Sequence, residues 1–307
     1  MYITIFIICF IILAYFVLVG NFFTRQVMYI KTQSLDAIYD RELAEHRFDE
    51  DFYLNIGQKT FSVPSRYGYN LNGILYEPYQ TNKWIIICHG VTVNKNNSIK
   101  YVELFIKLGF NVLSYDHRRH GESGGETTSY GYYEKYDLQT IFQFLKELKG
   151  NQTIIGIHGE SMGASTMLQF AGFIEDAADF YVSDCAFATF HQQLSYRLKT
   201  DYKIPKWAIL PIGNIWLRFR DQYVINDISP IDAVRSIQKP ILFIHSKPDL
   251  YIPYTDTVTL FKAKKKGIKK LFLAERGGHA MSLNLNKQQY YEAVKQFLKQ
   301  IKISTRI

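Results

Sequence analysis

Short apolar runs alternate with helical patterns along most of this 307-residue chain, and this alternation restricts the possible fold more than any other feature. The run Trp84–Cys88 is apolar throughout, which is typical of a strand covered on both faces. Strands that alternate with helices form a mostly parallel sheet with helices on both faces. The sequence therefore predicts one doubly wound α/β domain over residues 58–303.

The expected elements follow from the apolar spacing along this domain. Strands are predicted at residues 60–64, 73–76, 84–88, 111–115, 153–157, 180–183, 241–244 and 271–273, the first two forming a hairpin. Helices are predicted at residues 99–108, 138–148, 162–174 and 287–301. One more helix is predicted between the last two strands.

The alternation stops between residues 186 and 240, where aromatic and basic side chains dominate. Insertions of this length between two core strands are often functional. Two interpretations remain open for this segment. It forms a lid over the site, or it packs as helices over the edge of the sheet.

The first 24 residues carry no charged side chain, and residues 3–20 are almost wholly apolar. About 20 such residues cross a bilayer core of roughly 30 Å. The segment lacks the basic start and the small-residue cleavage site of a signal peptide. A helix that is apolar on every face is also rare in a globular core. We predict a single transmembrane helix over residues 1–24, followed by a juxtamembrane segment over 25–57.

Basic residues follow this span and none precedes it. Arg25 and Lys31 place the C-terminal side in the cytoplasm by the positive-inside rule, so we expect a single-pass membrane protein with a cytoplasmic catalytic domain. Leu35, Ile38 and Leu43 have helical spacing and predict an amphipathic helix. The acidic run 49–51 is expected to be a solvated turn.

Composition narrows the possible partners. Lys and Arg number 36 against 28 Asp and Glu, and the net charge of +8 permits attraction to nucleic acid or to an anionic membrane without requiring either. The three cysteines are far apart, so neither a disulfide framework nor a zinc site is indicated. The chain contains no nucleotide-binding glycine motif. We predict no cofactor and no nucleic-acid partner.

A G-x-S-x-G motif at residues 159–163 lies between a predicted strand and a predicted helix. Residues without a Cβ on both sides let such a turn close tightly and lift Ser161 clear of the sheet. The N-terminus of the following helix then points at the place where negative charge develops. Ser161 is the predicted nucleophile.

A serine needs a base, and in sites of this type the acid and then the histidine follow the serine in the chain. Three histidines follow Ser161: His191, His245 and His279. His191 begins the insert and His245 closes a strand. His279 lies in a loop directly after the last strand, which is where α/β folds place functional groups. His279 is the predicted base.

The acid that orients His279 is expected after the preceding strand. Asp249 occupies a Pro-marked turn there and is the preferred candidate. Asp184, at the end of the strand that follows the Ser161 helix, is the competitor. The oxyanion would be bound by the backbone N–H groups of Met162, directly after the nucleophile, and Val91, in the loop after Gly90.

A second polar cluster invites a metal interpretation. Asp116, His117, His120 and Glu122 lie within seven residues of one another. A catalytic zinc site requires three well-spaced ligands in a preformed geometry. The preferred interpretation is a polar loop network, so no metal site is predicted.

Several of these motifs together resemble the α/β-hydrolase superfamily over about residues 60–303. Ile87–Gly90 resembles its oxyanion strand, Tyr115–Ser123 its D-x-R-G-H-G-x-S loop, and residues 159–163 its nucleophile elbow. The regions of Asp249 and His279 resemble the segments that deliver acid and base. The likeness is greatest to a membrane-anchored lineage related to serine aminopeptidase-type and BEM46-like hydrolases. Arg119 and Ser246 stand where the family usually has glycine.

The resemblance implies hydrolysis through an acyl-enzyme, without fixing the substrate. The aromatic insert and the membrane segment favour a lipid-like acyl ester. Five lysines between residues 264 and 270 would favour an anionic leaflet, or form a solvated helix end. An aminopeptidase or amidase is the second hypothesis, although the insert has few carboxylates (Asp201, Asp221 and Asp227) to hold a substrate amine. The third hypothesis is a non-catalytic binding protein.

Overall fold

A single eight-stranded sheet forms the centre of the protein. The computed structural model describes residues 1–305. The strand order is β1-β2-β4-β3-β5-β6-β7-β8. Strand β2 runs antiparallel to both of its neighbours, β1 and β4, and all other neighbouring strands are parallel. The strands are β1 Gln58–Pro64, β2 Asn70–Tyr76, β3 Lys83–Cys88, β4 Asn111–Tyr115, β5 Ile154–Glu160, β6 Phe180–Asp184, β7 Ile241–Ser246 and β8 Lys269–Ala274. All eight predicted strands and the predicted hairpin are present.

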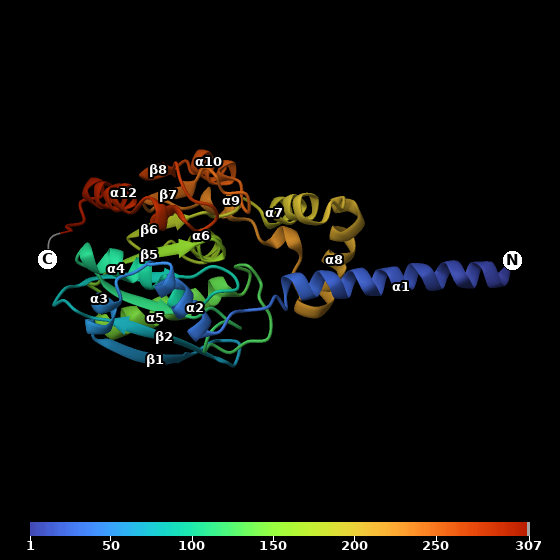
Figure 1. Cartoon of the computed structure of the whole chain (residues 1–307), viewed down its shortest axis with the longest axis horizontal. Helices are drawn as coiled ribbons and strands as arrows, with labels where there is room; N and C mark the ends of the chain where they lie inside the picture. The colour runs from blue at the N-terminus through green and yellow to red at the C-terminus, as the bar shows by residue number, and fades with distance from the viewer. Residues whose placement is uncertain (306–307) are drawn as a thin grey trace.

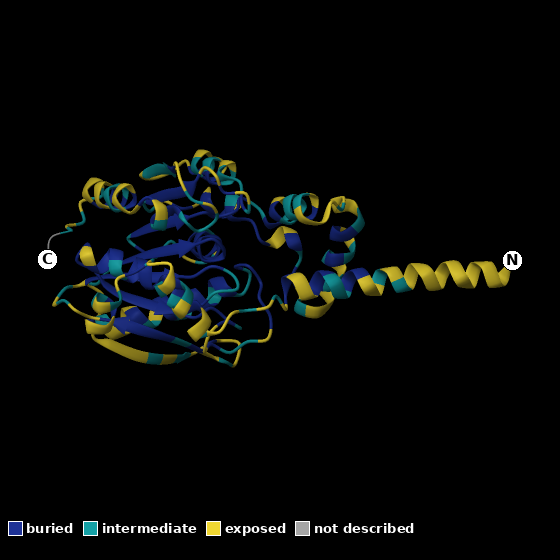
Figure 2. Cartoon of the chain, viewed as in Figure 1, coloured by how far each residue is buried: buried dark blue, intermediate teal, exposed yellow. Residues whose placement is uncertain are grey.

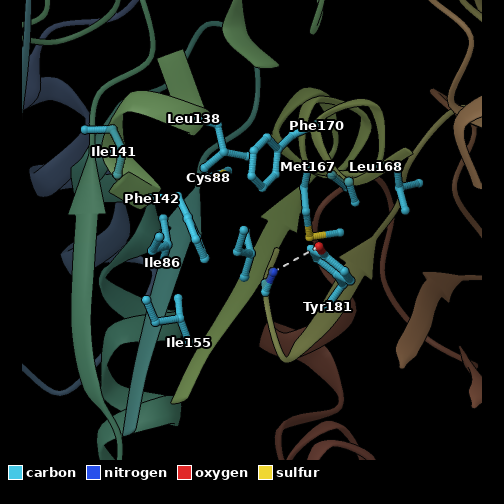
Figure 3. Close-up of a cluster of buried hydrophobic side chains, with 14 of the residues drawn as sticks. Ile86, Cys88, Leu138, Ile141, Phe142, Ile155, Met167, Leu168, Phe170 and Tyr181 are labelled. Carbon is cyan, nitrogen blue, oxygen red and sulfur yellow. Dashed lines mark hydrogen bonds between the residues drawn. The ribbon is translucent and has the colours of Figure 1, made fainter. Parts of the chain in front are cut away.

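Helices cover both faces of the sheet (Figure 1). They are α4 Ile99–Lys107, α5 Glu134–Lys149, α6 Met162–Phe173, α10 Tyr254–Ala263, α11 Ser282–Leu285 and α12 Lys287–Gln300. Strand β3 shows why: Trp84, Ile86 and Cys88 point into the core under α5 and α6, whereas Ile85 and Ile87 point into the core under α4 and α12. Figure 3 shows the first of these cores. The predicted doubly wound α/β class is confirmed.

Helix α5 begins four residues earlier than the apolar spacing predicts. Its first residue, Glu134, is buried, and its carboxylate accepts hydrogen bonds from the backbone of Ser129 and Gly131 at 2.8 Å each and from the Ser129 hydroxyl at 2.5 Å. An apolar pattern does not register a helix start that is fixed by a buried carboxylate.

The segment between the first helix and the sheet contains two short helices. Helix α2, Leu35–Ala44, is the predicted amphipathic helix and is capped by Ser34. Helix α3, Glu50–Asn55, begins at Asp49, which accepts a hydrogen bond from Phe52 N at 3.0 Å. The acidic run predicted to be a turn is therefore a helix start. Carboxylates are favourable there because they complement the helix dipole.

Helix α1, Tyr2–Val27, projects from the domain at the end opposite the C-terminus (Figure 1). Its first part is exposed, whereas Phe23, Thr24 and Val27 are buried (Figure 2). By length and composition the helix could cross a membrane. It continues three residues beyond the predicted end of the span, because its last turns pack against the rest of the protein.

The insert contains α7 Phe190–Arg197, a π turn Leu198–Tyr202, α8 Lys206–Asp221, a 3-10 turn Ile225–Asp227 and α9 Pro230–Val234. The helices of the insert lie in different places. Helix α9 packs on α6, where a Cβ on Gly172 would lie 2.2 Å from Ala233 O. Helix α8 instead lies beside α1, away from the sheet (Figure 1).

Candidate active site

The G-x-S-x-G segment forms a strained turn between β5 and α6. Ser161 has φ +55°, a conformation that costs energy for any residue with a Cβ. A Cβ on Gly163 would lie 2.1 Å from Cys88 O, and one on Gly159 would lie 2.5 Å from Ala164 N. Both glycines are therefore required by close backbone approaches that hold Ser161 at the sheet edge.

The structure brings Ser161, His279 and Asp249 together. Ser161 Oγ lies 2.8 Å from His279 Nε2, and His279 Nδ1 lies 2.7 Å from Asp249 Oδ2. Because an ionised carboxylate only accepts, Nδ1 is the donor to Asp249 and Nε2 is left to accept the serine proton. The three residues come from the loops after β5, β7 and β8, at the carboxyl end of the parallel strands.

Asp249 is held by more than its contact with His279. Its Oδ1 accepts the backbone N–H groups of Tyr251 at 2.8 Å and Ile252 at 2.9 Å. Burial alone would raise the pKa of Asp249, but hydrogen bonds from His245 and His279 outweigh burial and hold the pKa well below its usual range. The carboxylate is therefore ionised at neutral pH.

His245 is a site residue that the sequence analysis assigned only to a strand end. Its Nε2 lies 3.0 Å from Asp249 Oδ2 and 2.9 Å from Ile252 O. A carbonyl oxygen only accepts, so Nε2 carries a proton, and Nδ1 contacts the Thr257 hydroxyl at 2.7 Å. The only sequence signal for this role was that His245 precedes Asp249, the residue in the Pro-marked turn, by four positions.

Asp184, the competing acid, belongs to a separate buried network. Its carboxylate accepts from Ser282 at 3.0 Å and Tyr101 at 3.3 Å. Burial and the nearby Glu160 raise the pKa of Asp184 to about 6. Burial would also raise the pKa of Glu160, but the Lys100 ammonium 2.8 Å away lowers it. This network includes Glu160, the residue directly before Ser161, and therefore helps to fix the turn that carries the nucleophile.

The two predicted oxyanion residues both lie close to the serine. Met162 is the first residue of α6, and Val91 lines the cavities next to Ser161. The Val91 loop is fixed by its neighbour Thr92, whose N–H lies 3.2 Å from His120 Nε2 and whose carbonyl accepts from Gln33 N at 2.9 Å. The segment between α1 and α2 thus supports the loop.

The polar cluster proposed as a metal alternative is a hydrogen-bonded network. Lys95 Nζ lies 2.6 Å from both Asp116 Oδ2 and Glu122 Oε2. Burial lowers the pKa of His120 to about 4, so its ring is neutral. Arg119, in place of the usual glycine, has φ +65° and donates to Ile30 O at 2.5 Å. Within residues 1–305, no group of three or more His, Cys, Asp or Glu has metal-site spacing.

Two cavities of different character meet at Ser161. The first is mainly apolar, and its walls include Phe23 and Val27 of α1 with Phe190 and Leu194 of the insert. The second is more polar than the first and extends past His279 to Gln33, Arg41 and Lys100. The contribution of α1 was missed, because no short-range pattern reports contact between segments so far apart in the sequence.

Comparison with known proteins identifies the family. A family model described as the alpha/beta hydrolase fold matches residues 83–228. An uncharacterized Bacillus subtilis protein, YqkD, is 46% identical over 94% of both chains. The chain belongs to the α/β-hydrolase superfamily.

Solved structures agree with this assignment of the fold. The Pyrococcus furiosus esterase Pf2001 matches with a TM-score of 0.67 and 22% identity over 81% of this chain and 94% of the esterase. A Pyrococcus horikoshii acylaminoacyl peptidase matches with a TM-score of 0.61 and 16% identity over 82% of this chain and 43% of the peptidase. The α/β-hydrolase fold predicted from the sequence is confirmed.

The lysines between residues 264 and 270 are far from the site of this hydrolase. Three of them precede β8 and the other two, Lys269 and Lys270, begin it, so all five lie at the amino end of the parallel strands, opposite Ser161. Lys264 Nζ donates to the carbonyls of Ile237 and Lys239 at 3.0 and 2.8 Å. Lys269 Nζ donates to Phe261 O at 2.8 Å. These two lysines close a turn, which argues against a membrane-binding role for the cluster.

Proposed function

We propose that this α/β hydrolase cleaves carboxylic esters through an acyl-enzyme at Ser161. The hydrogen-bonded array Ser161–His279–Asp249 on a strained elbow carries the proposal. His279 Nε2 takes the serine proton as Oγ attacks the ester carbonyl, and Asp249 stabilises the imidazolium. The N–H groups of Val91 and Met162 stabilise the oxyanion. His279 then protonates the leaving alkoxide, and water releases the acid by the same steps in reverse.

An acyl ester fits the cavities better than a peptide with a free amine. The apolar cavity suits an acyl chain. Asp201 lies on its wall, but Arg197 neutralises it at 2.5 Å, and Glu160 in the polar cavity is paired with Lys100. A substrate ammonium group would therefore meet no free carboxylate from either residue. The peptidase alternative rests on the resemblance to serine aminopeptidase-type hydrolases and on the likeness to the acylaminoacyl peptidase.

We also propose that α1 anchors the enzyme in a membrane. Its uncharged sequence and exposed first part support this. Arg25 and Lys31 favour a cytoplasmic domain. Protease added to intact cells should then leave the domain uncleaved, whereas cleavage of the domain would contradict this orientation.

The test of the catalytic proposal uses the full chain in detergent, a fluorophosphonate probe and p-nitrophenyl esters. Wild type should be labelled and active, and Ser161→Ala should lose both. Ser165→Ala is the matched control, because Ser165 lies one turn further along α6 and its buried hydroxyl has no hydrogen-bond partner among the described residues. A folded wild type that neither reacts nor hydrolyses any ester would support the binding-protein alternative.

A further inference from the structure

The apolar cavity next to Ser161 is shared by two parts of the protein that are distant in sequence. Its α1 wall contains Phe22, Phe23, Gln26 and Val27, and its other wall comes largely from the insert. The proposed membrane helix is therefore part of the substrate cavity as well as an anchor. A chain bound there would lie directly beside a helix that continues into the bilayer.

Helix α8 follows α1 for several turns in the same direction. Tyr15 OH donates to Ala208 O at 2.9 Å, and Arg220 donates to Thr24 Oγ1 at 2.7 Å. Between these contacts Trp216 lies against Gly20, where a Cβ would come within 2.0 Å of the indole. The start of α8 is thus level with Tyr15, and its end is level with Thr24.

Helix length sets the depth of these contacts in a bilayer. Residues 3–20 number 18 and extend about 27 Å, which is slightly less than the roughly 30 Å of a hydrocarbon core. All 18 residues, including the stretch from Tyr15 to Gly20, are therefore needed to span the hydrocarbon core. The part of α8 packed against this turn must lie at the same depth.

The exposed side chains of α8 suit that depth. Trp207 is 75% exposed, Ile215 56% and Phe219 83%, although these are large apolar groups. Lys203 and Lys206 next to Trp207 are exposed, and their long side chains can reach the headgroups while their stems stay in apolar surroundings. An exposed apolar face of this kind needs an apolar environment to cover it. The bilayer that surrounds α1 would extend directly over this face of α8.

We propose that α8 enters the same bilayer as α1 and that the enzyme takes its acyl chain from the bilayer through the cavity between them. This inference rests on the proposed esterase function and names the substrate class as a membrane-resident acyl ester. The ester carbonyl would meet Ser161, with the acyl chain on the α1 side. The polar part of the substrate would lie in the cavity of Gln33 and Arg41, whose lining contains no residue of α1.

The depth of Trp207 tests this insertion without any enzyme assay. The double variant Trp84→Phe/Trp216→Phe leaves Trp207 alone and is placed in phosphatidylcholine–phosphatidylglycerol vesicles containing brominated lipid. Bromolipid should quench at least half of its emission. The matched variant Trp207→Phe/Trp216→Phe leaves only Trp84, which is 1% exposed in the domain, and should be quenched little. Unquenched, water-like emission from Trp207 would overturn the inference.

A second measurement tests substrate entry. Phe219 is exposed and does not line the apolar cavity, so Phe219→Glu should spare hydrolysis of water-soluble p-nitrophenyl acetate. Hydrolysis of a long-chain ester embedded in vesicles should fall at least tenfold. Leu148→Glu is the control, because Leu148 is a half-exposed apolar residue of α5 away from α1.

The outcomes separate this inference from the proposed function. If the wild type hydrolyses neither ester, the proposed esterase function is refuted. The quenching of Trp207 would still show whether α8 enters the bilayer. Unchanged hydrolysis of the vesicle ester by Phe219→Glu would overturn bilayer entry. A dimer in the absence of lipid that Phe219→Glu dissociates would also overturn it, since the face would then bind a second copy.

Discussion

The domain around the sheet and the unit formed by α1 and α8 are built in different ways. In the domain, Ser161, Asp249 and His279 each follow a strand, and strand register fixes their places. In the α1–α8 unit, contacts join residues almost 200 positions apart and depend on two glycines, Gly20 and Gly213, that allow close packing. In the proposed function, the domain carries out the chemistry and the α1–α8 unit selects the acyl chain.

The largest expected effect distinguishes the two aspartates of the domain. Asp249→Asn should lower kcat by roughly 10³- to 10⁴-fold, because the amide no longer holds His279 in the productive tautomer and charge state. Asp184→Asn should lower kcat by less than about tenfold, because Asp184 contacts Ser282 and Tyr101. Steady-state kinetics with a soluble ester measures both. A similar loss in the two variants would contradict the assignment of Asp249.

The elbow glycines provide the next largest effect. Gly163→Ala should destabilise the protein by about 3 kcal/mol or more, because its Cβ would meet rigid backbone at Cys88. Chemical denaturation measures this change. Gly57→Ala is the control, since a Cβ there meets nothing within 4 Å. Equal stability of the two variants would show that the close approach at the elbow is not rigid.

The buried network should give a pH-dependent stability. Burial and Glu160 raise the pKa of Asp184 to about 6, above its ordinary value of 3.8. Between these pH values Asp184 binds more protons in the folded than in the unfolded state. Its contribution to the free energy of unfolding therefore falls as pH rises, by on the order of 2–3 kcal/mol in all. Relative to wild type, Asp184→Asn should therefore become more stable between pH 4 and 7. A constant difference across this range would contradict the raised pKa.

The smallest effect lies in the α1–α8 unit. Arg220 donates to Thr24 and Asn21 at 2.7 Å each and lies over the Trp216 ring. Arg220→Ala should weaken this contact by about 1–2 kcal/mol, so limited proteolysis within the insert should accelerate roughly tenfold while kcat for a soluble short ester is kept. Arg235→Ala, which breaks an exposed pair with Asp232, should change neither. Loss of short-ester activity in Arg220→Ala would show that the unit and the domain are coupled.

Local patterns were sufficient to predict the domain. The apolar runs of β3 and β5 and the glycines around Ser161 are short-range signals, and they placed the sheet and the elbow correctly. The positions of Asp249 and His279 followed from chain order after two strands. The start of α5 was misplaced and Asp49 was assigned to a turn, because carboxylates fixed both helix starts.

Contacts that depend on the whole fold could not be predicted. His245 contacts Asp249 only after the turn between β7 and α10 closes. The packing of α1 on α8 depends on the size of Gly20 and Gly213 against Trp216 and Phe23, which periodicity does not report. The substrate cavity was therefore hidden, although both of its walls had been noted separately.

The most direct test is a structure of the enzyme in a lipid nanodisc after reaction with a long-chain alkyl fluorophosphonate. The account predicts a phosphonate bonded to Ser161 Oγ, an alkyl chain between Phe23 and Phe190, and Trp207 at the level of the lipid tails. An adduct on another residue, or a chain that leaves past Gln33 and Arg41 into water, would contradict it.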